Sequence, residues 1–123
     1  MIREWKLFKG GPSLPRRDRL YVTLNTRGMI LINHKLFDEM GRPEAALLLY
    51  DERNQTIGVQ PARPGEQYSF PLKIRGNASH RSIYAWPFCK LFKLRPEKTV
   101  RFTDPKLDDD GILLLDLHNS HQV

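Results

Sequence analysis

Apolar and polar residues alternate over residues 20–25, and this period of two predicts a half-buried strand. Thr26-Arg27-Gly28 then predicts a turn, and the next four residues are apolar on both faces, as in a central strand. Asn33 is expected to cap a helix that ends at Gly41. The first half therefore predicts the order strand, strand, helix, strand, strand, over residues 20–25, 29–32, 34–40, 45–50 and 56–60.

A second set of elements follows a linker, residues 61–66, that is rich in Pro and Gly. Residues 67–75 alternate, and Pro71 predicts an edge strand because proline has no N–H to donate to a ladder. The inward side chains of this strand are expected to be Tyr68, Phe70, Leu72 and Ile74. The later elements are a strand 82–85, a helix opened by Pro87 and reaching about residue 94, a hairpin of 99–103 with 111–117, and a frayed tail 118–123.

Arg-Pro-Glu occurs at 42–44 and again at 95–97, and the flanking residues align without a gap at an offset of 53. The offset pairs Ile30 with Ile83. A fixed offset indicates an internal repeat, and each half alone is too small to bury its apolar face. We expect a basic N-terminal tail 1–19, one compact domain 20–117 made of repeats 20–61 and 67–117, and a C-terminal tail 118–123. Trp5, Leu7 and Phe8 are candidates to anchor the first tail on the body.

The 123-residue chain has an ordinary soluble composition, 40% apolar and 28% charged. No apolar run approaches the roughly 18 residues of a membrane span. The first residues also lack the apolar core of a signal peptide. A single cysteine, Cys89, excludes an internal disulfide and any multi-cysteine metal site. We expect a cytoplasmic protein that does not associate with membranes.

The net charge of +6 is distributed unevenly along the chain. Basic and acidic segments alternate, with net charges of +6, −3, +7 and −4 over residues 1–35, 36–60, 61–101 and 102–123. If a pseudo-twofold relates the two halves, the basic segments share one face, and such a face suits a polyanion. A charge that serves only solubility is the alternative.

The order strand, Arg27-Gly28 turn, strand, seven-residue helix, strand, strand resembles the AbrB-like swapped-hairpin superfamily, which includes AbrB and SpoVT transcription factors, MazE-type antitoxins and MraZ. The resemblance is carried by residues 22–33, 40–41, 47–51 and 57–61. It implies a mainly β fold with two short helices, in which tandem ββαββ repeats form a pseudo-twofold swapped-hairpin β-barrel. It also implies a transcriptional regulator that binds double-stranded DNA through basic β-hairpin loops, as a monomer with a pseudo-dimer core or as a homodimer.

Basic residues of the N-terminal tail and of the first hairpin of each half are the candidate nucleic-acid contacts. The resemblance favours Arg27 and Arg19 among them, and arginine suits such sites because its planar fork binds phosphate or guanine in a bidentate way. The full set is Arg16, Arg17, Arg19, Arg27, Lys73, Arg75 and Arg81. The alternative is that these side chains only solvate exposed loops.

No motif predicts catalysis, a cofactor site or a metal site. Cys89 and Trp86 are expected to be core residues, and Asp108-Asp109-Asp110 is expected to form a turn rather than a cation site. Two other functions stay open. One is a protein-interaction module, antitoxin-like or accessory to phage defence, that contacts its partner through the tails. The other is a barrel that binds a small ligand between the halves.

Overall fold

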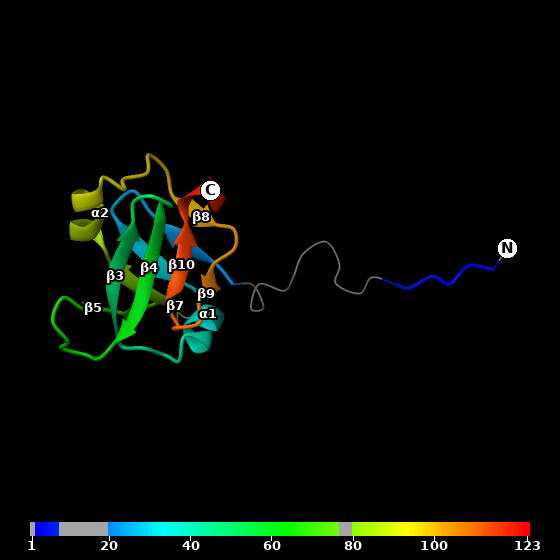
Figure 1. Cartoon of the computed structure of the whole chain (residues 1–123), viewed down its shortest axis with the longest axis horizontal. Coiled ribbons are helices and arrows are strands. Elements are labelled where there is room, and N and C mark those ends of the chain that lie inside the picture. Colours follow the sequence, from blue (N-terminus) through cyan, green and yellow to red (C-terminus); the bar gives the residue numbers. More distant parts are fainter. Residues whose placement is uncertain (1, 8–19, 77–79) are drawn as a thin grey trace.

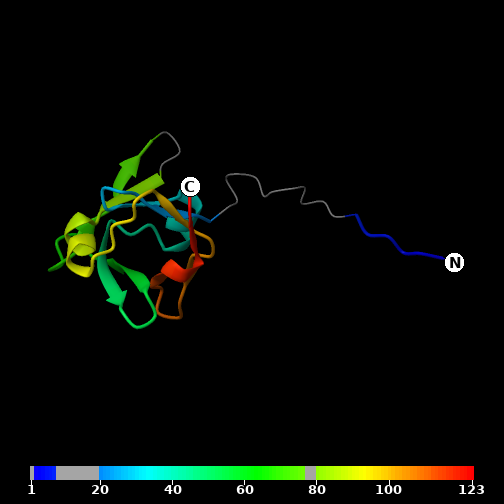
Figure 2. The same cartoon turned by 90° about the horizontal axis from the view of Figure 1, so that it is seen from above.

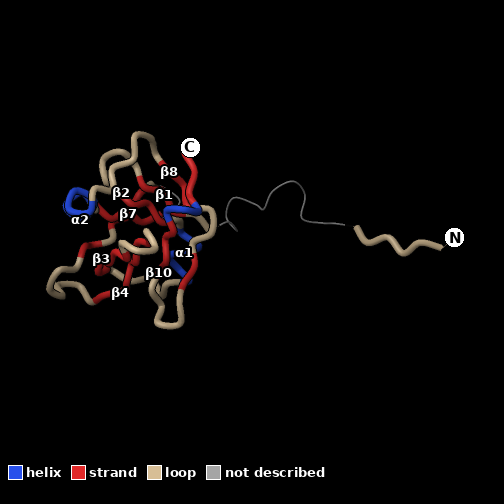
Figure 3. The backbone as a smooth tube through the Cα atoms, turned by 45° about the horizontal axis from the view of Figure 1, so that its top comes forward, coloured by secondary structure: helices blue, strands red, loops and turns tan. Residues whose placement is uncertain are grey.

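The computed structural model describes residues 2–7, 20–76 and 80–123. Two short helices, α1 (His34–Glu39) and α2 (Trp86–Phe92), lie at opposite ends of a body built mainly of strands (Figure 1, Figure 3). A 3₁₀ helix, Leu117–Asn119, precedes the last strand. The strands are β1 (Val22–Leu24), β2 (Met29–Ile32), β3 (Ala45–Asp51), β4 (Thr56–Ala62), β5 (Phe70–Pro71), β6 (Lys73–Arg75), β7 (His80–Tyr84), β8 (Val100–Phe102), β9 (Lys106–Leu107), β10 (Leu113–Asp116) and β11 (Ser120–Gln122).

The strands form two antiparallel sheets that lie as separate layers (Figure 2). The six-stranded sheet has the order β11-β8-β1-β2-β7-β6, and the five-stranded sheet has the order β5-β3-β4-β10-β9. The mainly β fold with two short helices is therefore confirmed. The closed barrel is wrong, because within the described residues each sheet ends in two edge strands. The chain passes from one sheet to the other at Leu72: Pro71 closes β5 and Lys73 begins β6, while the Leu72 N–H still donates to the Glu44 carbonyl at 3.0 Å.

The core lies between the two sheets and takes side chains from both. Its fully enclosed members include Val22, Ile30, Ile32, Ile57, Val59, Ile83, Leu113 and Leu115. Burial of each such side chain stabilises the folded state by roughly 1.5–3 kcal/mol relative to leaving it exposed. The inward face predicted for residues 67–75 is only half right. Phe70 and Leu72 pack against the core, but Tyr68 is 80% exposed and Ile74 68%, since Tyr68 precedes β5 and Ile74 lies on the edge strand β6.

Asn33 caps α1, as the sequence predicts. Its side-chain oxygen accepts hydrogen bonds from the backbone N–H of Leu36 at 3.3 Å and of Tyr21 at 3.2 Å, and the residue is 2% exposed. Gly41 ends the helix with a φ of 88°, which glycine adopts without strain. One buried side chain thus joins the start of α1 to the segment that leads into β1.

Asn33→Ala is expected to lower the free energy of unfolding by about 1–2 kcal/mol, because two backbone donors lose their acceptor. Urea denaturation followed by circular dichroism measures the change. Asn33→Ser keeps a capping hydroxyl and should recover part of the loss. Equal losses in the two variants would contradict the capping role.

The end of the chain departs from its predicted hairpin. Residues 99–103 do not pair with 111–117: β8 lies between β1 and β11, and β10 lies between β4 and β9. Residues 118–123 are not frayed, because they form the last two residues of the 3₁₀ helix and then β11. The N–H of Val123 also donates to the Thr99 carbonyl at 2.9 Å. β11 covers the edge that β8 would otherwise present to solvent, and a covered edge cannot pair with another chain.

The anchoring role expected of the first apolar residues is also wrong where the structure describes them. Trp5 and Leu7 are each 82% exposed and Ile2 is 95% exposed, and residues 2–7 form no strand or helix. Phe8 lies outside the described residues.

Candidate nucleic-acid interface

The six-stranded sheet has one face on the core and one face on solvent, and we call the second its outer face. Ile30 and Ile83 are directly opposite each other on β2 and β7 and are both fully buried, so they define the core face. Directly paired residues point to the same side of a sheet, and neighbours along a strand point to opposite sides. One row of paired residues therefore runs across the outer face from β6 to β11: Lys73, Ser82, Leu31, Thr23, Arg101 and His121. Ser82 is itself buried, at 4% exposed.

Cationic side chains lie flat on this outer face instead of extending into solvent. The Arg101 guanidinium lies 4.6 Å from the centre of the Tyr21 ring, a cation–π contact. Tyr21 in turn meets the His80 ring edge-on, with ring centres 6.0 Å apart. Arg75 reaches from β6 across β7, and its Nη2 donates to Met29 Sδ on β2 at 3.0 Å. The outer face thus combines guanidinium groups with aromatic rings.

The two sheets differ sharply in charge. Within the bounds given above, the six-stranded sheet contains four Lys or Arg residues, two histidines and no Asp or Glu. The strands of the five-stranded sheet contain two acids, Asp51 and Asp116, and one base, Lys106. Positive potential is therefore expected over the six-stranded sheet, and such a surface attracts phosphate-rich ligands.

The structure brings together only some of the seven predicted contacts. Lys73 and Arg75 lie on the outer face, and both are exposed. Arg81 lies on the core face instead: it pairs with the buried Ile32, and its guanidinium is 4.2 Å from the centre of the Phe37 ring. Arg27 is exposed in the turn between β1 and β2. Arg16, Arg17 and Arg19 lie outside the described residues.

The first hairpins of the two halves do not present their turns side by side. β2 and β7 run antiparallel, with Met29 opposite Tyr84 at one end of the ladder and Ile32 opposite Arg81 at the other. The turn that holds Arg27 precedes Met29 at the first end, whereas Arg75 and His80, the paired ends of β6 and β7, lie at the second. A nucleic-acid interface that used the first hairpins of both halves would therefore have to extend along the whole β2–β7 ladder. The candidate interface is instead the outer face of the sheet.

Arg101 is the outer-face cation that sequence reasoning missed. The signal was present, because Val100 and Phe102 flank it and the alternation predicts that an arginine between two inward residues faces outward. What the sequence does not reveal is that β8 pairs with β1, which places Arg101 in the same row as Lys73.

The other candidate residues have structural explanations. Burial raises the pKa of the Cys89 thiol, and the residue is 0% exposed, so the protonated side chain acts as a small core group. Asp108 accepts hydrogen bonds from the N–H of Asp110 at 2.9 Å and of Ile112 at 2.8 Å, which is the geometry of a turn. In the part of the chain that the structure describes, no cluster of three or more His, Cys, Asp or Glu could hold a metal ion.

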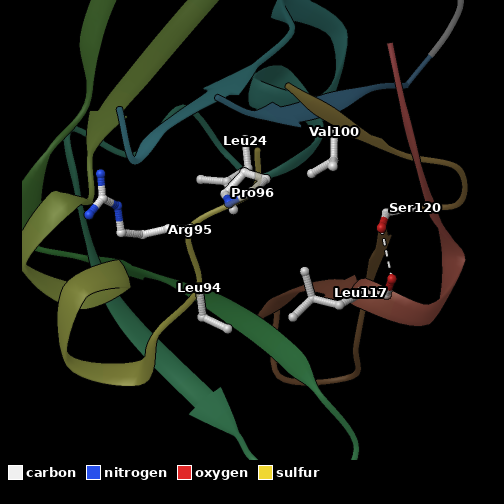
Figure 4. Close-up of a pocket in the computed structure, with 7 residues that line it drawn as sticks. All are labelled: Leu24, Leu94, Arg95, Pro96, Val100, Leu117 and Ser120. Carbon is white, nitrogen blue, oxygen red and sulfur yellow. Dashed lines mark hydrogen bonds between the residues drawn. The ribbon is translucent and has the colours of Figure 1, made fainter. Parts of the chain in front are cut away.

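A small pocket of about 200 Å³ opens between the segment after α2 and the last residues of the chain (Figure 4). It is lined by Leu24, Leu94, Arg95, Pro96, Val100, Leu117 and Ser120. The Ser120 hydroxyl donates to the Leu117 carbonyl at 2.7 Å, and the Arg95 guanidinium lies 4.4 Å from the centre of the Trp86 ring. The polar groups of the pocket are thus engaged with protein atoms, and the apolar lining offers little to fix a polar ligand.

Among the described residues, no helix is long and apolar enough to cross a membrane. Comparison with known protein families, with curated proteins and with solved structures finds no match for this chain.

Proposed function

We propose that this protein is a transcriptional regulator that binds double-stranded DNA through the outer face of its six-stranded sheet. The observation that carries the proposal is the charge of this sheet, whose six strands hold four Lys or Arg residues and no acid. Lys73, Arg75 and Arg101 lie on its solvent side, where they are able to contact phosphates. Neutralising phosphates with such groups releases counterions, which drives binding to a duplex.

We further propose an AbrB-like, swapped-hairpin scaffold made of two related halves. The pairing between halves supports it, because each hairpin pairs with strands of the other half in four ladders: β1 with β8, β2 with β7, β3 with β5 and β4 with β10. The β2–β7 ladder maps onto itself under a twofold axis that passes between Ile30 and Ile83, which are 53 residues apart. This is the offset of the repeated Arg-Pro-Glu.

Lys73→Ala combined with Arg101→Ala tests the DNA proposal. Each phosphate contact contributes roughly 0.9 to the slope of log affinity against log salt concentration, so the double variant should lower that slope by roughly 1.8. The slope is obtained from fluorescence anisotropy with a labelled duplex over roughly 50–300 mM salt, a range in which duplex affinity falls steeply.

The matched control is Arg53→Ala combined with Arg63→Ala. It removes the same charge from exposed positions in the β3–β4 turn and after β4, next to the five-stranded sheet. This control should keep the wild-type slope. Duplex binding that is absent, or equally weakened by both double variants, would refute the proposal. Tighter binding to a single strand than to a duplex would assign the face to single-stranded nucleic acid instead.

A protein-interaction module is the second candidate, and one observation favours it. Ile2, Trp5 and Leu7 are each more than four-fifths exposed, and large apolar side chains gathered in one short segment are typical of a contact with another protein. A partner held by this segment would be retained by the double variant Lys73→Ala/Arg101→Ala and lost on deletion of residues 1–19.

A further inference from the structure

The basic residues of the outer face lie at different places across the sheet. Lys73 on β6 and Arg101 on β8 belong to one row, and three strands separate them. Four inter-strand steps of about 4.8 Å place their backbones roughly 19 Å apart. Arg75 starts on β6, but its guanidinium lies against Met29 on β2, so it stands between these two residues in the order of strands.

This spacing fits one groove of DNA better than the other. The major groove is about 12 Å wide and has a phosphate backbone on each side, whereas the minor groove is only about 6 Å wide. The side chains of Lys73 and Arg101 start roughly 19 Å apart, and the Arg101 guanidinium lies over the Tyr21 ring, so their two charges are able to meet phosphates on both sides of the major groove. A guanidinium held between them then faces the floor of that groove.

We propose that Arg75 reads base identity by contacting guanine in the major groove, while Lys73 and Arg101 contact phosphates of the two strands. The inference rests on the proposed function and adds a specificity-determining residue to it. Guanine offers O6 and N7 as two acceptors that a guanidinium contacts together. A thioether is only a weak acceptor, so the exposed contact with Met29 is readily exchanged for a base.

Arg75→Lys is the decisive variant, because it keeps the charge and loses the planar fork. The wild type and the variant are each used to select duplexes from a library with a randomised centre. The wild type should enrich a guanine at a fixed position, with a preference of roughly 5- to 150-fold over other bases. The variant should bind unselected duplex DNA within about threefold of the wild type, with the same salt slope. Its preference for that guanine should be smaller, because a lysine ammonium contacts O6 and N7 without the planar fork that matches both acceptors.

The groove is tested with the selected duplex. Replacing the enriched guanine by 7-deazaguanine removes one acceptor from the major groove and leaves the minor groove unchanged. It should weaken binding of the wild type more than binding of Arg75→Lys. Equal enrichment of the same guanine by the wild type and Arg75→Lys, or indifference of the wild type to 7-deazaguanine, would overturn the inference while the DNA-binding function stands. A wild type that binds no duplex would overturn both.

Discussion

Gly28→Ala is expected to lower the free energy of unfolding by about 2–4 kcal/mol, through backbone strain and a steric clash together. Gly28 has a φ of 75°, a conformation that an L side chain rarely adopts. A Cβ at this position would lie 2.8 Å from Trp86 Cα, and a backbone atom cannot move aside as a flexible side chain does. Urea denaturation of the variant, followed by far-UV circular dichroism, measures the loss.

Gly76→Ala is the matched control. Gly76 follows β6 with a φ of 71°, and a Cβ there would meet no atom of the described residues within 4 Å. Gly76→Ala should therefore lower the free energy of unfolding only by the cost of a positive φ in an L residue, about 1 kcal/mol, with no steric clash. A loss at Gly28 no larger than the loss at Gly76 would mean that the contact with Trp86 relaxes freely.

The close approach at Gly28 connects the first hairpin to α2. The Gly28 carbonyl accepts a hydrogen bond from the N–H of Ala85 at 2.8 Å, and Ala85 immediately precedes the helix. Within the turn, the Asn25 side chain accepts from the N–H of Arg27 and of Met29, each at 2.9 Å. The turn therefore fixes Met29, the residue that Arg75 contacts, and a displaced turn would disturb the outer face.

The first half of the chain was predictable because its signals are local. Alternation placed Val22 and Leu24 inward, and Asn33 and Gly41 marked the two ends of α1. Each signal depends on neighbours in the sequence, which the alternation and capping rules describe. The edge position of Pro71 is confirmed for the same reason, since a missing N–H restricts a strand wherever it lies.

Strand partners were not predictable, because pairing between distant segments leaves no local signal. The alternation around Arg101 predicted a strand, but nothing near it indicated β1 and β11 as neighbours. The same limit explains Arg81, which looks like a loop cation in the sequence. Its place opposite the buried Ile32 follows from the register of β2 with β7. The candidate site thus emerged from sheet order more than from motifs.

Ile83→Ala is expected to lower the free energy of unfolding by about 2–5 kcal/mol, the range found when a fully buried isoleucine or leucine is truncated. Ile83 is 0% exposed and lies directly opposite Ile30, at the centre of the ladder between the two halves. The cavity would open where β2, β7 and the five-stranded sheet meet, and neighbours anchored in two sheets collapse into it poorly. Urea denaturation measures the loss.

Ile74→Ala removes the same atoms from a side chain that is 68% exposed, so its loss should stay within about 0.5 kcal/mol. Because the β2–β7 ladder joins the halves, weakening it should not leave one half folded on its own. Far-UV and near-UV circular dichroism of Ile83→Ala should therefore give one coincident transition at a lower urea concentration. Two separate transitions would show that the halves fold independently, and equal losses at Ile74 and Ile83 would contradict the central place of the Ile30–Ile83 pair in the core.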